Sequence, residues 1–224
     1  MGDAPRKPEL LKAELFAQLA RVGKALANGT RLELLDLLAQ AERSVEALAR
    51  AARLNLTTAS AHLQTLRQAG LVSARRDGTR IFYRLAGSDV ADLYARARDV
   101  AAHRLPDAAA ARDAYLGPDD AGEPVSREEL LRRATAGEVT VVDVRPPDEY
   151  AAGHIRGAVN IPLDQLAERL GEVPDGVEVV AYCRGRFCVL AHDAVRLLSG
   201  RGRQARRLED GMLEWRLADL PLAR

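Results

Sequence analysis

Both cysteines of this 224-residue chain lie in one short segment, "AYCRGRFCVL" at residues 181–190. Cys183 and Cys188 are separated by two arginines, a glycine and a phenylalanine. In a reducing compartment, two close thiols are more often catalytic, redox-active or metal-binding than crosslinked. A structural zinc site usually needs four ligands, and this segment supplies two cysteines. We therefore expect thiol chemistry here, with no bound metal and no cofactor.

The composition and the N-terminal segment favour a protein located in a reducing compartment. Hydrophobic residues make up 47% of the chain and charged residues 29%, which is an ordinary balance for a globular protein. No run approaches 18 consecutive apolar residues, and the start "MGDAPRKPELLKAELF" lacks the apolar core of a signal peptide. We expect a cytoplasmic protein with no membrane partner.

Strands and helices alternate around the two thiols. The apolar run "EVVAY" at 178–182 ends directly before Cys183, and the segment 189–200 has a helical pattern that ends at Gly200. An earlier strand is predicted at 139–144, a later one around 204–208, and further helices after Ser126 and around Trp215. Such alternation predicts a mainly parallel sheet covered on both faces, with ligands at the carboxyl ends of its strands. Cys183 falls at such an end.

A loop between a strand and a helix N-terminus turns its backbone N–H groups inward and forms an anion-binding nest. We expect this field to lower the pKa of Cys183 and to make it the catalytic thiolate. The expected partner is a small sulfur-donor anion, or a persulfide held on this thiol. The alternatives are a buried inert cysteine and arginines that are merely solvated. The predicted substrate loop contains Arg184, Gly185, Arg186, Phe187 and Val189.

Cys188 has two interpretations, which the sequence leaves open. As a resolving thiol it would attack a persulfide on Cys183 and form a disulfide or a bridged polysulfide. As a small hydrophobic residue it would pack under the loop. A Cα–Cα distance beyond about 7 Å would exclude the bond.

Three segments of the second half resemble the rhodanese sulfurtransferases: "VVDVRPPDEYAAGHIRGAVNIPL", "AYCRGRFC" and "EDGMLEWRLADLPL". The resemblance covers about residues 125–224, and it implies that Cys183 accepts a sulfane sulfur atom and passes it to a thiol or to cyanide. Asp143, Arg145 and His154 match motif positions and are expected to be structural. Related phosphatases carry one more loop residue followed by an arginine. Here Val189 stands at that place, which argues against phosphate or arsenate chemistry.

Charge separates the two halves of the chain. Residues 1–100 carry 16 Lys and Arg against 11 Asp and Glu, whereas residues 101–224 carry 17 against 21. Between them, residues 105–124 contain three prolines and two glycines without apolar periodicity, which favours a linker. We predict a DNA-binding and dimerisation domain over 1–104, a linker over 105–124 and a second domain over 125–224.

The first half has the pattern of short helices followed by a hairpin. Helices are predicted over 9–22, after Asn28, after Ser44 and from Asn55 to about Ala69, and the last has a small, polar outer face suited to a major groove. The hairpin turns at Asp77 and would form a basic wing. The alternative is a solvated arginine-rich face. The predicted DNA contacts are Thr57, Thr58, Ser60, Ala61, Gln64, Arg67, Arg75, Arg76 and Arg80.

Three segments over about residues 10–105 resemble the ArsR-type winged-helix repressors: "ALANGTRLELLDLL", "TTASAHLQTLRQAGLV" and "RRDGTRIFYRL". The resemblance implies a homodimer formed by helices around 9–22 and 88–104, bound to a palindromic double-stranded DNA operator. Metal-sensing members place cysteines in the helix before the recognition helix, where this chain has "SVEALARAA". Cysteine-based metal sensing at that place is excluded.

The predicted fold therefore has two domains: a mainly α winged helix-turn-helix with a β-hairpin wing, then an α/β rhodanese-like domain with a mainly parallel sheet. Every thiol lies outside the DNA-binding half, so a thiol signal must start in the second domain. The leading hypothesis is a dimeric transcriptional repressor in which persulfide formation on Cys183 modulates operator binding. The alternatives are an active thiosulfate or polysulfide sulfurtransferase tethered to DNA without sensing, and an inactive rhodanese module that binds a ligand. Whether the chain is an enzyme stays open.

Overall fold

The computed structural model describes residues 8–118 and 123–224. By internal contacts the chain divides between Val90 and Ala91, and the two parts are described separately. In the described residues, no helix is long and apolar enough to cross a membrane.

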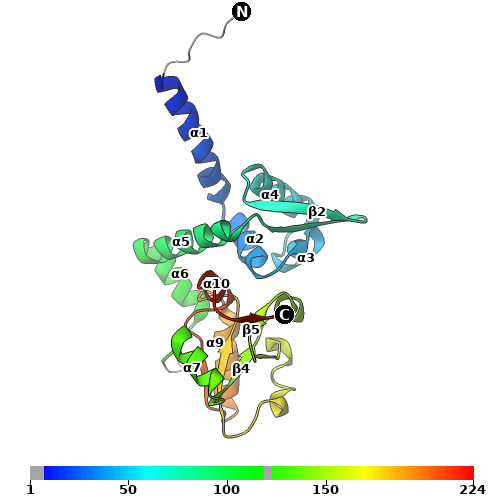
Figure 1. The fold of residues 1–224 in the computed structure, drawn as a ribbon, viewed down its shortest axis with the longest axis vertical. Helices are drawn as coiled ribbons and strands as arrows, with labels where there is room; N and C mark the ends of the chain where they lie inside the picture. The colour runs from blue at the N-terminus through cyan, green and yellow to red at the C-terminus, as the bar shows by residue number, and fades with distance from the viewer. Residues whose placement is uncertain (1–7, 119–122) are drawn as a thin grey trace, which may run out of the picture. The chain divides into compact units, whose positions relative to one another are not determined.

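The N-terminal part is a winged helix-turn-helix (Figure 1). The side chains of Asn28, Ser44 and Asn55 accept hydrogen bonds from backbone amides three residues later, which confirms the predicted starts of three helices. Three antiparallel strands pair in the order β1-β3-β2. The elements are α1 (Pro8–Leu26), α2 (Gly29–Gln40), β1 (Arg43–Ser44), α3 (Val45–Ala51), α4 (Leu56–Gln68), β2 (Val72–Asp77) and β3 (Arg80–Leu85).

Leucines of α2, α3 and α4 form the core of this part, and Leu35, Leu48 and Leu63 are completely buried. Tyr83 of the wing is buried as well. Ile81, two residues before Tyr83 on the same strand, is instead 41% exposed, because it pairs with Arg76 near the tip of the hairpin. The leucines along α1 are exposed.

The C-terminal part is an α/β domain preceded by two helices (Figure 1). Helix α5 crosses the division, and its residues 91–104 belong to this part. Its elements are α5 (Ser88–Arg104), α6 (Pro106–Leu116), α7 (Arg127–Thr135), β4 (Val139–Asp143), α8 (Pro147–Ala151), β5 (His154–Ile155), β6 (Val159–Asn160), η1 (Leu163–Gln165), η2 (Leu170–Glu172), β7 (Glu178–Tyr182), α9 (Val189–Gly200), β8 (Ala205–Arg207), α10 (Met212–Leu217) and β9 (Leu222–Ala223).

Four parallel strands pair in the order β6-β4-β7-β8, while the short strands β5 and β9 pair antiparallel apart from them. One face of the parallel sheet is covered by α9, through Ala194, Val195 and Leu198. The other face is covered by α7 and α10, through Leu130 and Trp215. The predicted parallel sheet with helices on both faces is confirmed.

Residues 105–124, predicted as a linker, contain helix α6. This helix contains a run of four alanines, and alanine has the highest helix propensity of any residue type. Pro106 suits the first turn of a helix. The helix is also held by tertiary contacts: Leu116 is buried, and Arg196 of α9 donates a hydrogen bond to its carbonyl. The predicted domain boundaries stay a prediction.

Candidate functional site

Cys183 follows directly after β7 and begins the loop that leads into α9, as predicted. Its side chain is only 2% exposed and packs in the apolar cluster between α9 and the sheet. The Cys183 thiol donates a hydrogen bond to the Cys188 carbonyl over 3.3 Å. Cys188, at the N-cap position of α9, is half-buried. The two thiols therefore belong to one contact network inside the loop.

The protonation of the pair differs from the prediction. Burial raises the pKa of Cys183 well above its usual value, and a side-chain hydrogen bond between the Cys183 and Cys188 thiols raises it further. The same hydrogen bond lowers the pKa of Cys188. The expectation that the loop lowers the pKa of Cys183 is wrong for this geometry, because loss of water outweighs the backbone amides of Ala191 and Gly185, which act in the lowering direction.

The loop arginines are bound to carboxylates. Arg184 forms a forked pair with Glu149 of α8, with a closest contact of 2.6 Å, and the Glu149 side chain is completely buried. Arg186 lies 2.6 Å from Asp210, which also binds Arg127 of α7. Arg184 and Arg186 are therefore not merely solvated, as the alternative interpretation had it. These pairs fix the side chains and neutralise much of the positive charge at the rim of the loop.

The start of α10 fixes the main chain of the loop. The amides of Met212 and Leu213 donate hydrogen bonds to the carbonyls of Cys183 and Arg184, over 3.0 and 2.9 Å. Gly211 lies against Gly185 so closely that any Cβ would collide with the loop backbone. The glycine at 211 is therefore required by close approach and not by an unusual backbone angle.

Helix α5 also reaches the loop. The Arg98 guanidinium binds Glu214 of α10 at 2.6 Å, and its central carbon lies 4.7 Å from the centre of the Phe187 ring. Sequence reasoning did not identify Arg98 or Glu214. They are 116 positions apart, and no local pattern links them.

A buried network stabilises the sheet edge beside the loop. Asp143 and Arg145 are both completely buried and bind each other at 2.5 Å, and the Tyr182 hydroxyl donates to Asp143 over 2.6 Å. His154 stacks on Tyr150, with ring centres 3.7 Å apart. These contacts join β4, β7 and α8, and they fit a structural role for Asp143, Arg145 and His154.

In the N-terminal part, the predicted DNA-contacting side chains lie on α4 and on the hairpin. On α4, Thr57 and Ala61 are exposed, while Gln64 is half-buried and donates to the Tyr83 hydroxyl over 3.0 Å. Thr58 and Ser60 are also half-buried, and Arg67 is exposed.

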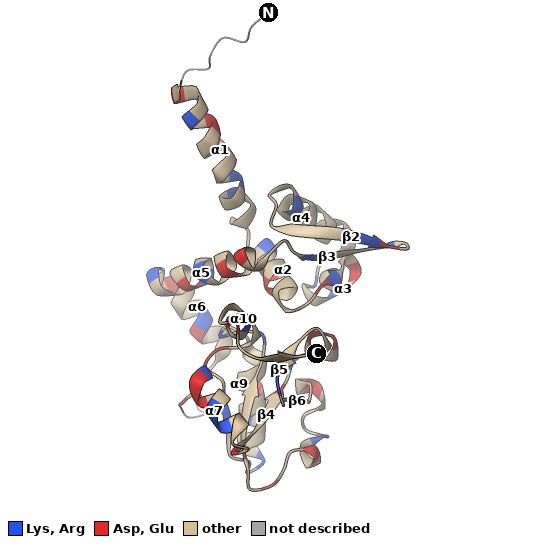
Figure 2. Ribbon diagram, in the orientation of Figure 1, with Lys and Arg blue, Asp and Glu red and all other residues tan. Residues whose placement is uncertain are grey.

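Figure 2 shows Lys and Arg positions in blue along β2 and β3 of the hairpin. Arg75, Arg76 and Arg80 are exposed. Arg75 is held by Glu42 and stacks 4.6 Å from the centre of the Phe82 ring. Arg76 donates to the Gly78 carbonyl over 3.0 Å, within the turn. Helix and wing thus carry the residues predicted to contact DNA.

Comparison with known proteins assigns a family to each part of the chain. Residues 28–74 match the family "Bacterial regulatory protein, arsR family", and residues 126–218 match "Rhodanese-like domain". The "HTH-type transcriptional regulator Rv0324" of Mycobacterium tuberculosis is 60% identical over 212 residues, which cover 94% of this chain and 92% of that protein. The chain belongs to the ArsR family of transcriptional regulators. It is a member that carries a rhodanese-like domain.

Two further relatives each match one part of this ArsR-family regulator. A "Sulfurtransferase" of Allochromatium vinosum is 32% identical over 99 residues, which cover 44% of this chain and 92% of that protein. A solved structure of the homodimeric winged helix-turn-helix DNA-binding domain of Mb0332 from Mycobacterium bovis is 58% identical. It covers 47% of this chain and 95% of that chain, with a TM-score of 0.42.

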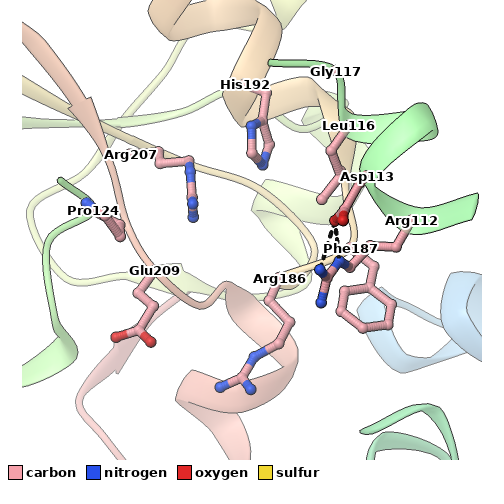
Figure 3. A pocket seen from close by; sticks show the side chains of 10 residues that line it. All are labelled: Arg112, Asp113, Leu116, Gly117, Pro124, Arg186, Phe187, His192, Arg207 and Glu209. Carbon is pink, nitrogen blue, oxygen red and sulfur yellow. Dashed lines mark hydrogen bonds and ion pairs between the residues drawn. The ribbon is translucent and has the colours of Figure 1, made fainter. Parts of the chain in front are cut away.

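Cavities of the regulator lie beside the loop. One, of about 480 Å³, is bounded by α6, α9 and the loop, and His192 and Arg207 point into it (Figure 3). Another, of about 280 Å³, is an apolar groove lined by Val144 and Leu190 together with three prolines. Cys183 is absent from the described residues that line either cavity.

Proposed function

We propose that this regulator is a homodimeric repressor that accepts sulfane sulfur on Cys183 and thereby changes its affinity for a DNA operator. The observation that carries the proposal is the placement of the thiols. Both cysteines of the chain lie in the strand-to-helix loop of the rhodanese-like domain, and the DNA-binding half has none. A thiol signal that reaches the operator therefore has to begin in this loop.

The sulfur-accepting step needs no external oxidant. The Cys183 thiol passes its proton to the neighbouring Cys188 thiolate, and the Cys183 sulfur attacks a terminal sulfur of inorganic polysulfide. One S–S bond forms and one breaks, a shorter polysulfide anion leaves, and Cys183 becomes a persulfide. Because the thiol is 2% exposed, the donor has to displace part of the loop packing to reach it.

Cys188 supplies the second step of the proposal. Its lowered pKa makes it the thiolate of the pair, and a thiolate can attack the Cys183 sulfur of the persulfide. This forms the Cys183–Cys188 disulfide and releases hydrosulfide, so atoms and electrons balance. Cys188 also packs against the apolar cluster of the domain, and that contact places it within the loop before reaction.

On the DNA side, the proposal uses the exposed residues of α4 and the wing. Thr57 and Ala61 present small side chains, as a helix in a major groove requires. Arg76 and Arg80 of the wing would contact phosphates. The exposed leucines of α1 support a homodimer, because a row of uncovered leucines on one helix favours a partner helix.

A second candidate function is an active sulfurtransferase tethered to DNA without sensing. The similarity to the Allochromatium vinosum sulfurtransferase favours it, since that protein is matched over 92% of its length. The two candidates differ in one respect: only the sensor links the chemistry of Cys183 to transcription. A rhodanese-like domain that takes up no sulfur would favour the inactive, ligand-binding alternative.

The proposal can be tested with a reporter gene. Its promoter carries an operator that the protein has first selected from a random pool of DNA duplexes. Cells receive polysulfide, and intact mass records the sulfur on the purified protein. For wild type we expect added sulfur, or the loss of two hydrogens that marks the Cys183–Cys188 disulfide, together with a changed reporter signal, and for Cys183→Ser neither. Sulfur uptake with an unchanged reporter would contradict the sensor and favour the tethered enzyme.

A further inference from the structure

Arg98 is a buried arginine on α5 that pairs with two carboxylates, Glu214 of α10 and its sequence neighbour Asp99. The side chains of Arg98 and Glu214 are only 8% and 10% exposed, and their closest contact is 2.6 Å. The second Glu214 oxygen accepts a hydrogen bond from the Gly211 amide over 3.0 Å. Burying two charges is costly unless geometry and further hydrogen bonds compensate, and both conditions are met here. The pair is therefore a built contact and not a chance surface meeting.

The same guanidinium lies beside residues 183–188, here called the sulfur loop, at two places. Its central carbon lies 4.7 Å from the centre of the Phe187 ring, within the range of a cation–π contact. At Gly185, an added Cβ would lie 3.4 Å from Arg98 Nη1 and 3.1 Å from Glu214 Oε2. Phe187 is thus in contact with Arg98, and Gly185 has room for no side chain beside Arg98 and Glu214.

These contacts attach the loop to a helix that continues toward the DNA-binding half in sequence. Helix α5 runs without interruption from Ser88 to Arg104, and it begins three residues after the wing strand β3 ends at Leu85. A packed interior transmits a displacement because it has few voids to absorb one. A sulfur atom added at Cys183 enlarges a side chain that is already buried, so the surrounding loop has to move.

We propose that Arg98 is a positioning residue that couples the sulfur loop to α5, by holding Phe187 and Glu214 in the reduced protein and releasing them when Cys183 carries added sulfur. This inference rests on the proposed function, because it names the contact through which the sulfur signal leaves the loop. Arg98 itself touches no reacting atom.

The test compares operator affinity before and after polysulfide for wild type, Arg98→Gln and Arg96→Gln. Arg96 is the matched control: it lies on the same helix, its side chain is 76% exposed, and it pairs with Asp92. Fluorescence anisotropy gives the affinity ratio, and intact mass gives the sulfur on the same samples. For wild type and Arg96→Gln we expect a change of about 5-fold or more, the lower range of allosteric coupling. For Arg98→Gln we expect a ratio within about twofold of unity, with the same change in mass as the wild-type protein.

Two conservative variants keep the test valid if Arg98→Gln does not fold. Arg98→Lys keeps a positive charge beside Glu214 but loses the planar group over Phe187, and it should restore part of the ratio. Phe187→Leu removes the ring and leaves the ion pair, so it should reduce the ratio. Wild-type ratios in the Arg98 and Phe187 variants would overturn the coupling role while leaving the proposed function intact. A flat wild-type response would overturn both.

Discussion

Gly211 lies against Gly185, so closely that a Cβ on Gly211 would be 2.4 Å from the Gly185 amide nitrogen and 2.6 Å from the Cys183 carbonyl oxygen. Atoms of these kinds do not approach so closely without movement, and each obstructing atom belongs to backbone. Gly211, directly before α10, therefore fixes the position of the sulfur loop relative to the sheet. The thiols depend on this contact for their position.

Replacing Gly211 by alanine should displace the loop. Overpacking of this kind costs about 1–3 kcal/mol, so we expect the free energy of unfolding to fall by that amount in a urea titration. Sulfur uptake by Cys183 should slow in the same variant. Gly200→Ala is the control, because an added Cβ there meets nothing within 4 Å. Equal stability of the two variants would contradict the close packing.

The two thiols should differ in their pH response. Because burial raises the pKa of Cys183 and the shared hydrogen bond lowers that of Cys188, iodoacetamide at neutral pH should modify Cys188 first. Labelling of Cys183 should increase as the pH rises, since only the thiolate reacts. Cys183→Ala removes the hydrogen bond, so the pKa of Cys188 should rise and its labelling should shift to higher pH. Peptide mass mapping measures both rates, and faster labelling of Cys183 at neutral pH would exclude this order.

Local patterns in the sequence were sufficient for most helices and strands. Asn28, Ser44, Asn55 and Ser126 each accept the hydrogen bond that their N-cap positions predict, because capping depends on residues within one turn. Helix α6 was not predicted, because the prolines and glycines around its alanine run are typical of a linker. The short strands β5 and β9 also escaped prediction, because their pairing joins residues far apart in sequence.

Asp143 should be critical for stability. It is completely buried with Arg145, and removing one partner of a buried ion pair costs about 3–5 kcal/mol, since the remaining charge is left without compensation. Asp143→Asn should therefore show a large decrease in the urea midpoint. The control is Glu138→Gln, which breaks an exposed pair with Arg132 and should cost at most about 1 kcal/mol. A decrease no larger than the control would show that the network does not stabilise the sheet edge.

The wing arginines should contribute to DNA affinity in proportion to the phosphates they bind. Arg76→Ala and Arg80→Ala should weaken binding to all sequences alike, and each should reduce the slope of log affinity against log salt by about 1, because one phosphate is no longer neutralised. Anisotropy titrations at several salt concentrations measure this slope. The exposed Arg132 of α7 is the control, and its replacement should leave the slope unchanged. An unchanged slope in the wing variants would contradict their binding to phosphate.

A charge on α1 should break the proposed homodimer. Leu15 is 56% exposed in the described chain, and burying a leucine on both protomers contributes about 3 kcal/mol or more, which corresponds to roughly 100-fold in the dimer dissociation constant. Leu15→Glu should raise that constant by at least this factor in analytical ultracentrifugation. Leu131→Glu, at an exposed leucine of α7, should leave it unchanged. A dimer of wild-type strength in Leu15→Glu would place the interface elsewhere.

The place of the candidate site after a strand could be predicted from the sequence, but its burial and its contacts could not. The apolar run before Cys183 fixed its place at the end of a strand, because strand and loop follow each other in sequence. Its depth could not be predicted, since burial depends on α9 and the sheet packing over it. Arg98 could not be found for the same reason: its contacts with Phe187 and Glu214 exist only once α5 and α10 are packed.

The most direct test of sulfur sensing is the operator affinity of wild-type protein, measured by anisotropy before and after polysulfide, with intact mass recorded on the same samples. We expect either the added mass of sulfur on Cys183 or the loss of two hydrogens that marks the Cys183–Cys188 disulfide, together with a change of operator affinity of about 5-fold or more that a thiol reductant reverses. Full sulfur loading with the same affinity in both states would contradict it.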